Sequence, residues 1–148
     1  MSAAGRLDLR GLAAVALGGS AGTAARMGVL AGAASLPGVP TILPLACINA
    51  LGGLLAGAIV ARRRPDAGRA ATLWFLALVP GFCGGFTTFS SLAGQAHDLL
   101  RGGAPTSALT ALVLGLMIGL AAGRGGRLAV SPKGRLAAVR AGPPTPPA

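Results

Sequence analysis

Residues 80–91 read Pro-Gly-Phe-Cys-Gly-Gly-Phe-Thr-Thr-Phe-Ser-Ser and lie within an uncharged run from Ala70 to Ala96. Three glycines, one proline and four hydroxyl side chains in this stretch disfavour an uninterrupted helix. We expect a break at Gly84-Gly85, which would free backbone carbonyls inside an apolar segment. Such carbonyls need a partner. Either a bound cation or the hydroxyl groups of Thr87 and Thr88 could supply one.

The rest of the chain is also apolar. Of the 148 residues 53% are apolar and 11% are charged, whereas soluble domains carry about 25% charged residues. The three acids are Asp8, Asp66 and Asp98. A soluble globule of this composition would expose large apolar patches to water, so the composition predicts a membrane protein.

The uncharged runs set the number of spans, because a membrane helix needs about 20 apolar residues. The run 27–61 is too long for one span and is divided by the Pro- and Gly-containing stretch 35–40. We therefore predict an all-α membrane protein with four transmembrane helices, the third of them broken, in the membrane domain 9–123. The predicted helices are about 9–32, 42–61, 71–96 and 106–123.

The segments outside the predicted membrane domain are short. Residues 1–8 form an N-terminal segment, and 124–148 form a basic, Pro-rich tail that we expect to be disordered. We expect the first apolar run to be retained rather than cleaved as a signal peptide, since no small-residue cleavage site precedes a polar sequence.

Positive charge predicts the orientation. Four spans place both termini and the second loop on one side, which would carry eleven basic residues: Arg6, Arg10, Arg62, Arg63, Arg64, Arg69, Arg124, Arg127, Lys133, Arg135 and Arg140. The other side has Arg101, with Arg26 near the end of the first span. Because positive loops stay inside, we expect both termini to be cytoplasmic in a multi-pass plasma-membrane protein.

Several function classes are disfavoured. The basic residues flank apolar spans without an aromatic-basic face, which argues against nucleic acid binding. Cys47 and Cys83 have no metal-ligand or disulfide spacing. No carboxylate lies within a predicted span, which argues against a proton antiporter and a small multidrug exporter. His97 and Asp98 adjoin a span end as a solvated pair, and we expect no enzyme activity.

Small residues recur four positions apart in every predicted span: Gly18 and Gly22; Gly53 and Gly57; Gly81 and Gly85; Gly115, Gly119 and Gly123. Such pairs let helix backbones approach closely in lipid, although an Ala- and Gly-rich chain also produces them by chance. Tightly packed short helices leave no wide internal pore. An ion pathway would then lie between subunits.

Three stretches resemble the Fluc (CrcB) family of fluoride channels. The most specific is Gly81–Ser90, Gly-Phe-Cys-Gly-Gly-Phe-Thr-Thr-Phe-Ser. Gly18–Arg26 is similar to the family's first-span motif, which ends in Arg, and Cys47–Gly52 is similar to its second-span motif around an Asn. The resemblance extends over about residues 11–123.

The resemblance implies an antiparallel dual-topology dimer that conducts F⁻ passively through two pores, with a structural Na⁺ at its centre. The backbone carbonyls of Gly84 and Thr87 would hold the Na⁺. The F⁻ pathway would use an amide donor, an aromatic ring edge and an attracting charge: Asn49, Phe89 and Arg26. Taken alone, these three residues are more typical of an interhelical hydrogen bond, a core position and a snorkelling side chain.

The implied roles agree with the chemistry of the groups. A phenyl ring has a positive edge, and an amide donates without carrying a net charge. Weak sites of this kind bind an anion without trapping it. Further hydroxyl donors could come from Ser90, Ser91, Ser107 and Thr110.

Two features depart from the family pattern. Leu92 stands where a second Phe is usual, and Met27 replaces the aromatic residue that commonly follows the Arg. The strong charge bias also opposes insertion in both orientations. We therefore expect an antiparallel heterodimer with a paralogue of opposite orientation, and a homodimer is the alternative. The alternative function is a non-conducting or partner-dependent subunit of a heterodimeric fluoride channel.

Overall fold

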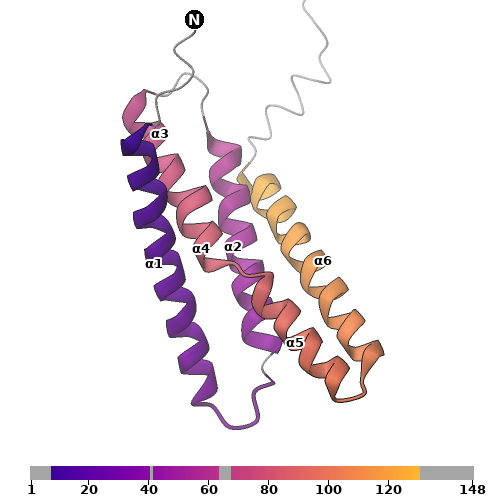
Figure 1. Ribbon diagram of the computed structural model, residues 1–148. Helices are drawn as coiled ribbons and strands as arrows, with labels where there is room; N and C mark the ends of the chain where they lie inside the picture. Colours follow the sequence, from indigo (N-terminus) through magenta and orange to yellow (C-terminus); the bar gives the residue numbers. More distant parts are fainter. Residues whose placement is uncertain (1–7, 41, 64–67, 131–148) are drawn as a thin grey trace, which may run out of the picture.

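A computed structural model describes residues 8–40, 42–63 and 68–130, and every element within them is a helix. The elements are α1 (Leu9–Ala34), α2 (Ile42–Arg62), α3 (Arg69–Leu76), η1 (Ala77–Cys83), α4 (Gly84–Phe86), α5 (Ser90–Arg101) and α6 (Pro105–Val130). α3, η1 and α4 follow one another directly, and residues 87–89 separate α4 from α5 (Figure 1).

Within these residues, three helical stretches are long and apolar enough to cross a membrane: Ile42–Arg62, Arg69–Arg101 and Pro105–Val130. The chain is therefore a multi-pass membrane protein. α1 has 26 residues but is not among these three stretches. Its role as a further span stays a prediction.

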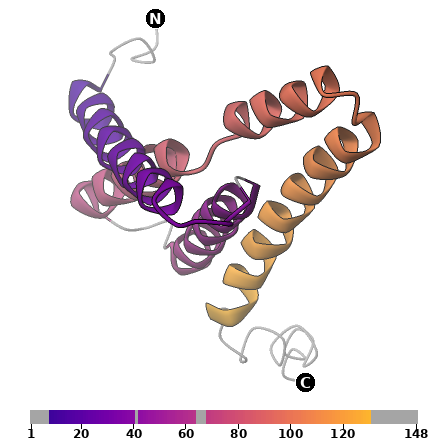
Figure 2. The same cartoon turned by 90° about the horizontal axis from the view of Figure 1, so that it is seen from below.

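The helices pack as two pairs. α1 lies along η1 and α4, and α2 lies along α6. α5 leads away from the first pair, and a tight turn connects it to α6. In the view from below, α5 and α6 form a V (Figure 2). Gly103, at φ 77°, lies in that turn, where a left-handed conformation favours glycine. The link 87–89 thus joins the two pairs.

Glycines provide the contact surfaces of both pairs. A Cβ on Gly18 or Gly22 of α1 would overlap the backbone carbonyl of Ala77 or Phe82. In the second pair, a Cβ on Gly57 of α2 would overlap the carbonyl of Gly123. These contacts confirm the packing role predicted for the first- and second-span glycines.

The predicted break at Gly84-Gly85 is wrong in position. Both glycines are helical, as the first two residues of α4, and a Cβ on Gly85 would overlap the backbone of Gly19 on α1. The helix is instead distorted earlier in the chain, at Pro80. Pro80 lies within η1, a π-helical stretch, because a proline has no N–H to offer and its ring crowds the preceding turn.

The last helix is longer than predicted. α6 runs from Pro105 to Val130, whereas the sequence predicted about 106–123. The first residues of the predicted disordered tail, 124–130, are therefore helical. Close packing accounts for this extension, because a Cβ on Gly126 would overlap the carbonyl of Leu54 on α2. The remainder of that tail, 131–148, lies outside the described residues, as does most of the predicted N-terminal segment.

Candidate functional site

The link between α4 and α5 is the only interruption inside the membrane-capable stretch 69–101. Thr87 has an extended backbone, with φ −73° and ψ 155°. Its N–H and its hydroxyl both donate to the carbonyl of Cys83, at 2.9 and 2.8 Å. The hydroxyl back-bonding considered from the sequence is therefore present at Thr87 and closes the end of α4.

Asn49 on α2 pairs with Thr88 at two points. The Asn49 amide Nδ2 donates to the Thr88 carbonyl at 3.1 Å, and the Thr88 N–H donates to Asn49 Oδ1 at 2.8 Å. In a continuing helix that N–H would bond to the carbonyl of Gly84. The amide side chain thus replaces a helical hydrogen bond at the break and releases the Gly84 carbonyl from that partner.

Two side chains of α1 reach carbonyls near the break. Arg26 Nη1 donates to the Thr87 carbonyl at 3.4 Å, and the Thr23 hydroxyl donates to the Gly85 carbonyl at 3.4 Å. Both bonds are long. They show that the carbonyls of Gly85 and Thr87 face α1.

The Thr88 hydroxyl organises the start of α5. Thr88 is 5% exposed. Its Oγ1 accepts the N–H of Ser91 at 3.1 Å and lies 3.1 Å from both Ser90 Oγ and Ser91 Oγ. An oxygen that accepts from the first turn of a helix satisfies an otherwise unpaired N–H. No role at this helix start was predicted for the Thr88 hydroxyl, although a Thr just before a helix is a typical capping residue.

Phe89 follows Thr88 and is 64% exposed. Together with Asn49, Thr88 and Leu92 it lines a cavity of about 250 Å³ beside α6. The predicted amide and aromatic residues therefore meet at one cavity. Leu92 itself is 2% exposed and packs against Gly115 of α6. A Cβ added to Gly115 would lie 2.5 Å from the Leu92 Cδ2.

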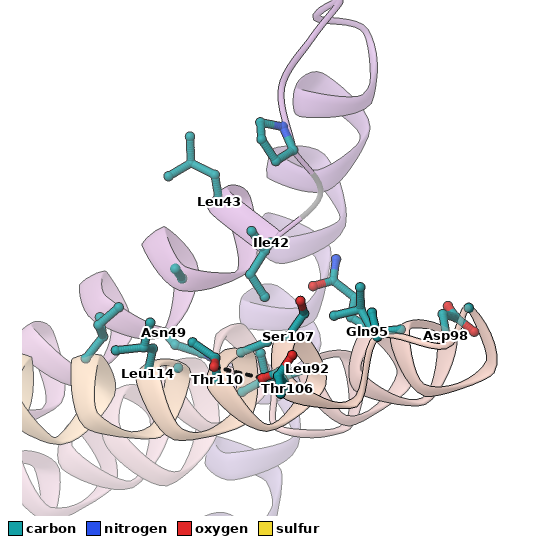
Figure 3. Close-up of a pocket in the computed structure, with 18 residues that line it drawn as sticks. Ile42, Leu43, Asn49, Leu92, Gln95, Asp98, Thr106, Ser107, Thr110 and Leu114 are labelled. Atoms are coloured by element: carbon teal, nitrogen blue, oxygen red, sulfur yellow. Dashed lines mark hydrogen bonds between the residues drawn. The ribbon is translucent and has the colours of Figure 1, made fainter.

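A larger cavity of about 900 Å³ opens between α2, α5 and α6. Asn49, Leu92, Ser107 and Thr110 line it (Figure 3). Asn49 and Leu92 border both cavities. The Thr110 hydroxyl donates to the Thr106 carbonyl at 2.8 Å. Its hydrogen is therefore used, and the hydroxyl can offer other partners only its oxygen lone pairs.

The predicted amide and hydroxyl residues therefore fall into two groups. Asn49, Ser107 and Thr110 share the larger cavity, whereas Ser90 and Ser91 line neither cavity and are tied to Thr88 instead. A residue without a predicted role also faces the larger cavity. The Gln95 amide oxygen is buried and has no hydrogen-bond partner among the described residues. A water molecule or a donor from a second subunit would satisfy it.

Comparison with known proteins identifies a family that matches most of the chain. A family model described as CrcB-like protein, Camphor Resistance (CrcB), covers residues 13–127. The Fluoride-specific ion channel FluC 2 of Symbiobacterium thermophilum is 39% identical over 111 residues, which are 75% of this chain and 89% of the relative.

Two further relatives are similar over most of their length. The Fluoride-specific ion channel FluC of Gloeobacter violaceus is 39% identical over 121 residues, covering 78% of this chain and 91% of the relative. That of Methanopyrus kandleri is 31% identical over 132 residues, covering 84% and 92%. The family resemblance predicted from residues 81–90, 18–26 and 47–52 is confirmed, and the chain belongs to the CrcB family.

Proposed function

We propose that this chain is a subunit of a fluoride-specific channel through which F⁻ leaves the cytoplasm passively. The observation that carries the proposal is the meeting of Asn49 and Phe89 at one cavity beside the helix break. HF crosses membranes as a neutral molecule and ionises in a near-neutral cytoplasm. The inside-negative membrane potential then drives the trapped anion outward.

The F⁻ pathway combines weak donors. The Asn49 Nδ2 has two hydrogens, and one of them is used on the Thr88 carbonyl. The other can donate to F⁻. Phe89 would add its positive ring edge, and neither group carries a charge that would hold the anion too tightly. Ser107 would extend the route along the larger cavity, where the Thr110 hydroxyl already donates to Thr106. Ser91 would add a donor beside the break, where Ser90 is bonded to Thr88.

Arg26 would draw anions toward the break. One of its five N–H donors is engaged with the Thr87 carbonyl. The guanidinium therefore keeps further donors and its full charge. A fixed positive charge near the pathway raises the local concentration of anions.

The backbone near the break fits a structural Na⁺. Carbonyl oxygens of an unwound helix are suitable ligands for this ion, and the Asn49–Thr88 pairing releases the carbonyl of Gly84. The Thr87 carbonyl has a second lone pair beyond its long bond to Arg26. When bound, Na⁺ would supply a compact positive charge to these oxygens. Two carbonyls from one chain do not enclose a cation, so a second subunit would complete the site.

The proposal includes a dimer with four spans per chain. Large apolar residues exposed on the single chain include Leu109 at 64% and Leu114 at 54% on α6. A second subunit or lipid must cover them. We assign α1 as the further span because it lies along η1 and α4. The subunits would run antiparallel, as a homodimer or as a heterodimer with a paralogue.

Charge supports a single orientation. The start of α1, the end of α2, the start of α3 and the end of α6 gather at one end of the bundle (Figure 1). That end carries Arg10, Arg62, Arg63, Arg69, Arg124 and Arg127. Asp8 pairs with Arg69 at 3.3 Å in an exposed salt bridge, which offsets little of this charge. We place this end in the cytoplasm.

Orientation can be measured with single cysteines. In a background with Cys47→Ala and Cys83→Ala, Leu128→Cys places a thiol at the end of α6 and Leu36→Cys places one in the opposite loop. Both side chains are exposed, at 73% and 59%. An impermeant maleimide added outside cells is expected to label Leu36→Cys and spare Leu128→Cys. Equal labelling of the two would contradict a fixed orientation and favour a homodimer.

Fluoride efflux from liposomes tests the function itself. The purified chain is reconstituted with internal KF, and efflux is followed with a fluoride electrode after a K⁺ ionophore is added. Efflux well above that of empty liposomes is expected, with no matching efflux of Cl⁻. Efflux only after co-reconstitution with a partner chain would support the partner-dependent subunit. No efflux in either case would refute the channel.

A further inference from the structure

The three hydroxyl groups around Thr88 are connected in a fixed direction. Thr88 Oγ1 donates to Ser91 Oγ at 3.1 Å and accepts the Ser91 N–H at 3.1 Å. A threonine hydroxyl has one hydrogen and two lone pairs. Because its hydrogen is used on Ser91, the remaining 3.1 Å contact with Ser90 Oγ requires Ser90 to be the donor.

The two serines therefore differ in whether their hydroxyl hydrogen is free. The Ser90 hydrogen is spent on Thr88. The Ser91 oxygen receives the Thr88 hydrogen, so the Ser91 hydrogen is left for another acceptor. Ser91 is also half-buried, whereas Ser90 is exposed. A donor screened from water binds an anion more strongly than an exposed donor.

The same threonine holds the predicted amide donor. Its backbone N–H and carbonyl bind the two ends of the Asn49 amide, at 2.8 and 3.1 Å. This two-point contact fixes which way the amide faces, because reversing it would oppose donor to donor and acceptor to acceptor. Thr88 is therefore bonded to Asn49 through its backbone and to Ser91 through its side chain, and both of these keep one free hydrogen.

We propose that Thr88 is a positioning residue of the anion pathway, which orients the Asn49 amide through its backbone and selects Ser91 rather than Ser90 as the hydroxyl donor. The inference rests on the proposed fluoride-channel function. Thr88 need not touch the anion. It acts by using the Ser90 hydrogen and leaving that of Ser91 free.

The test compares fluoride efflux of Ser90→Ala, Ser91→Ala, Thr88→Val and Thr88→Ser in liposomes. Ser91→Ala and Thr88→Val are each expected to slow efflux about tenfold, the value of one hydrogen bond to a charged group. Ser90→Ala is expected to stay within about twofold of the wild type, since its hydrogen is already used. Thr88→Ser keeps the hydroxyl and is expected to restore efflux.

A double variant separates positioning from general destabilisation. If Thr88 acts through Ser91, Thr88→Val is expected to add no further loss in a Ser91→Ala background. Three outcomes would each overturn the inference. Ser90→Ala and Ser91→Ala could lose efflux equally, the double variant could lose the product of the two single losses, or Thr88→Ser could fail to restore efflux.

Hydrogen exchange gives a second readout that does not need transport. Thr88→Val removes the acceptor of the Ser91 N–H, so exchange of this amide is expected to accelerate, and Thr88→Ser is expected to restore protection. Wild-type protein without efflux would refute the proposed function, and the inference would then be judged by exchange alone. Unchanged exchange in Thr88→Val would overturn it.

Discussion

Replacing Asn49 by leucine is expected to reduce fluoride efflux at least about 100-fold, corresponding to roughly 3 kcal/mol. The change removes the donor to the anion and both bonds to Thr88. The Thr88 N–H and carbonyl would then lack their partners in a part-buried, apolar setting, which costs more than the loss of a solvent-exposed bond. Efflux from liposomes with matched protein content measures the effect.

The aspartate variant is the matched comparison. Asn49→Asp keeps an acceptor for the Thr88 N–H but offers no amide hydrogen to the anion. Efflux should therefore fall in both variants, whereas exchange of the Thr88 amide should accelerate only in Asn49→Leu. Leu51→Ala, on the same helix at a side chain 55% exposed, should leave both readouts near those of the wild type. An Asn49→Leu protein that transports fluoride normally would remove Asn49 from the pathway.

Replacing Gly22 by alanine is expected to destabilise the folded chain by about 3 kcal/mol, at the upper end of overpacking costs. The added Cβ would overlap the backbone carbonyl of Phe82 and lie 2.9 Å from the Phe86 N. Backbone atoms cannot move aside as a flexible side chain can, so α1 would have to separate from η1 and α4. Thermal unfolding in detergent measures the change.

Gly28 provides the control on the same helix. A Cβ there meets no atom within 4 Å, so Gly28→Ala is expected to be neutral or to stabilise by up to about 1 kcal/mol through helix propensity. The second helix pair repeats the contrast. In Gly57→Ala the new Cβ would overlap the Gly123 carbonyl, so this variant is expected to be destabilised. In Gly119→Ala the atom nearest to the new Cβ is the Asn49 carbonyl oxygen, at 4.0 Å, so this variant is expected to be neutral. Equal stability of Gly22→Ala and Gly28→Ala would contradict the close approach of the helices.

The sequence supports a good part of this architecture. Long uncharged runs indicate the membrane-capable helices because their length must match the bilayer. For the first two helices the expected limits, 9–32 and 42–61, differ from the observed Leu9–Ala34 and Ile42–Arg62 by one or two residues at the C-terminal ends. The end of α6 differs more, because Gly126 packs on α2 and no local signal reveals such a contact.

The position of the break shows why local rules fail. Glycine lowers helix propensity, and this led to a predicted break at Gly84-Gly85. In the folded chain Gly85 instead permits contact with Gly19. The interruption falls later, where Asn49, 39 residues away in sequence, binds the Thr88 backbone. Propensity describes one helix in isolation, whereas this break depends on a second helix.

The candidate site was predicted in part for the same reason. Motif similarity pointed to Asn49 and Phe89, and both border one cavity. It gave no role to the Thr88 hydroxyl, whose importance comes from its bonds to Ser90 and Ser91, and none to Thr23, whose partner Gly85 is 62 residues away in sequence. The roles of Gly84 and Thr87 as cation ligands stay predictions.

The separation between Asn49 and Thr88 also bears on biosynthesis. Their bonds join residues 39 positions apart, and a ribosome needs about 2–8 s to add that many residues at 5–20 per second. During this interval a nascent α2 carries an amide whose final acceptor does not yet exist. A lone polar group is costly in hydrocarbon, so the emerging helix should remain beside the translocon or at the headgroups until the later segment arrives.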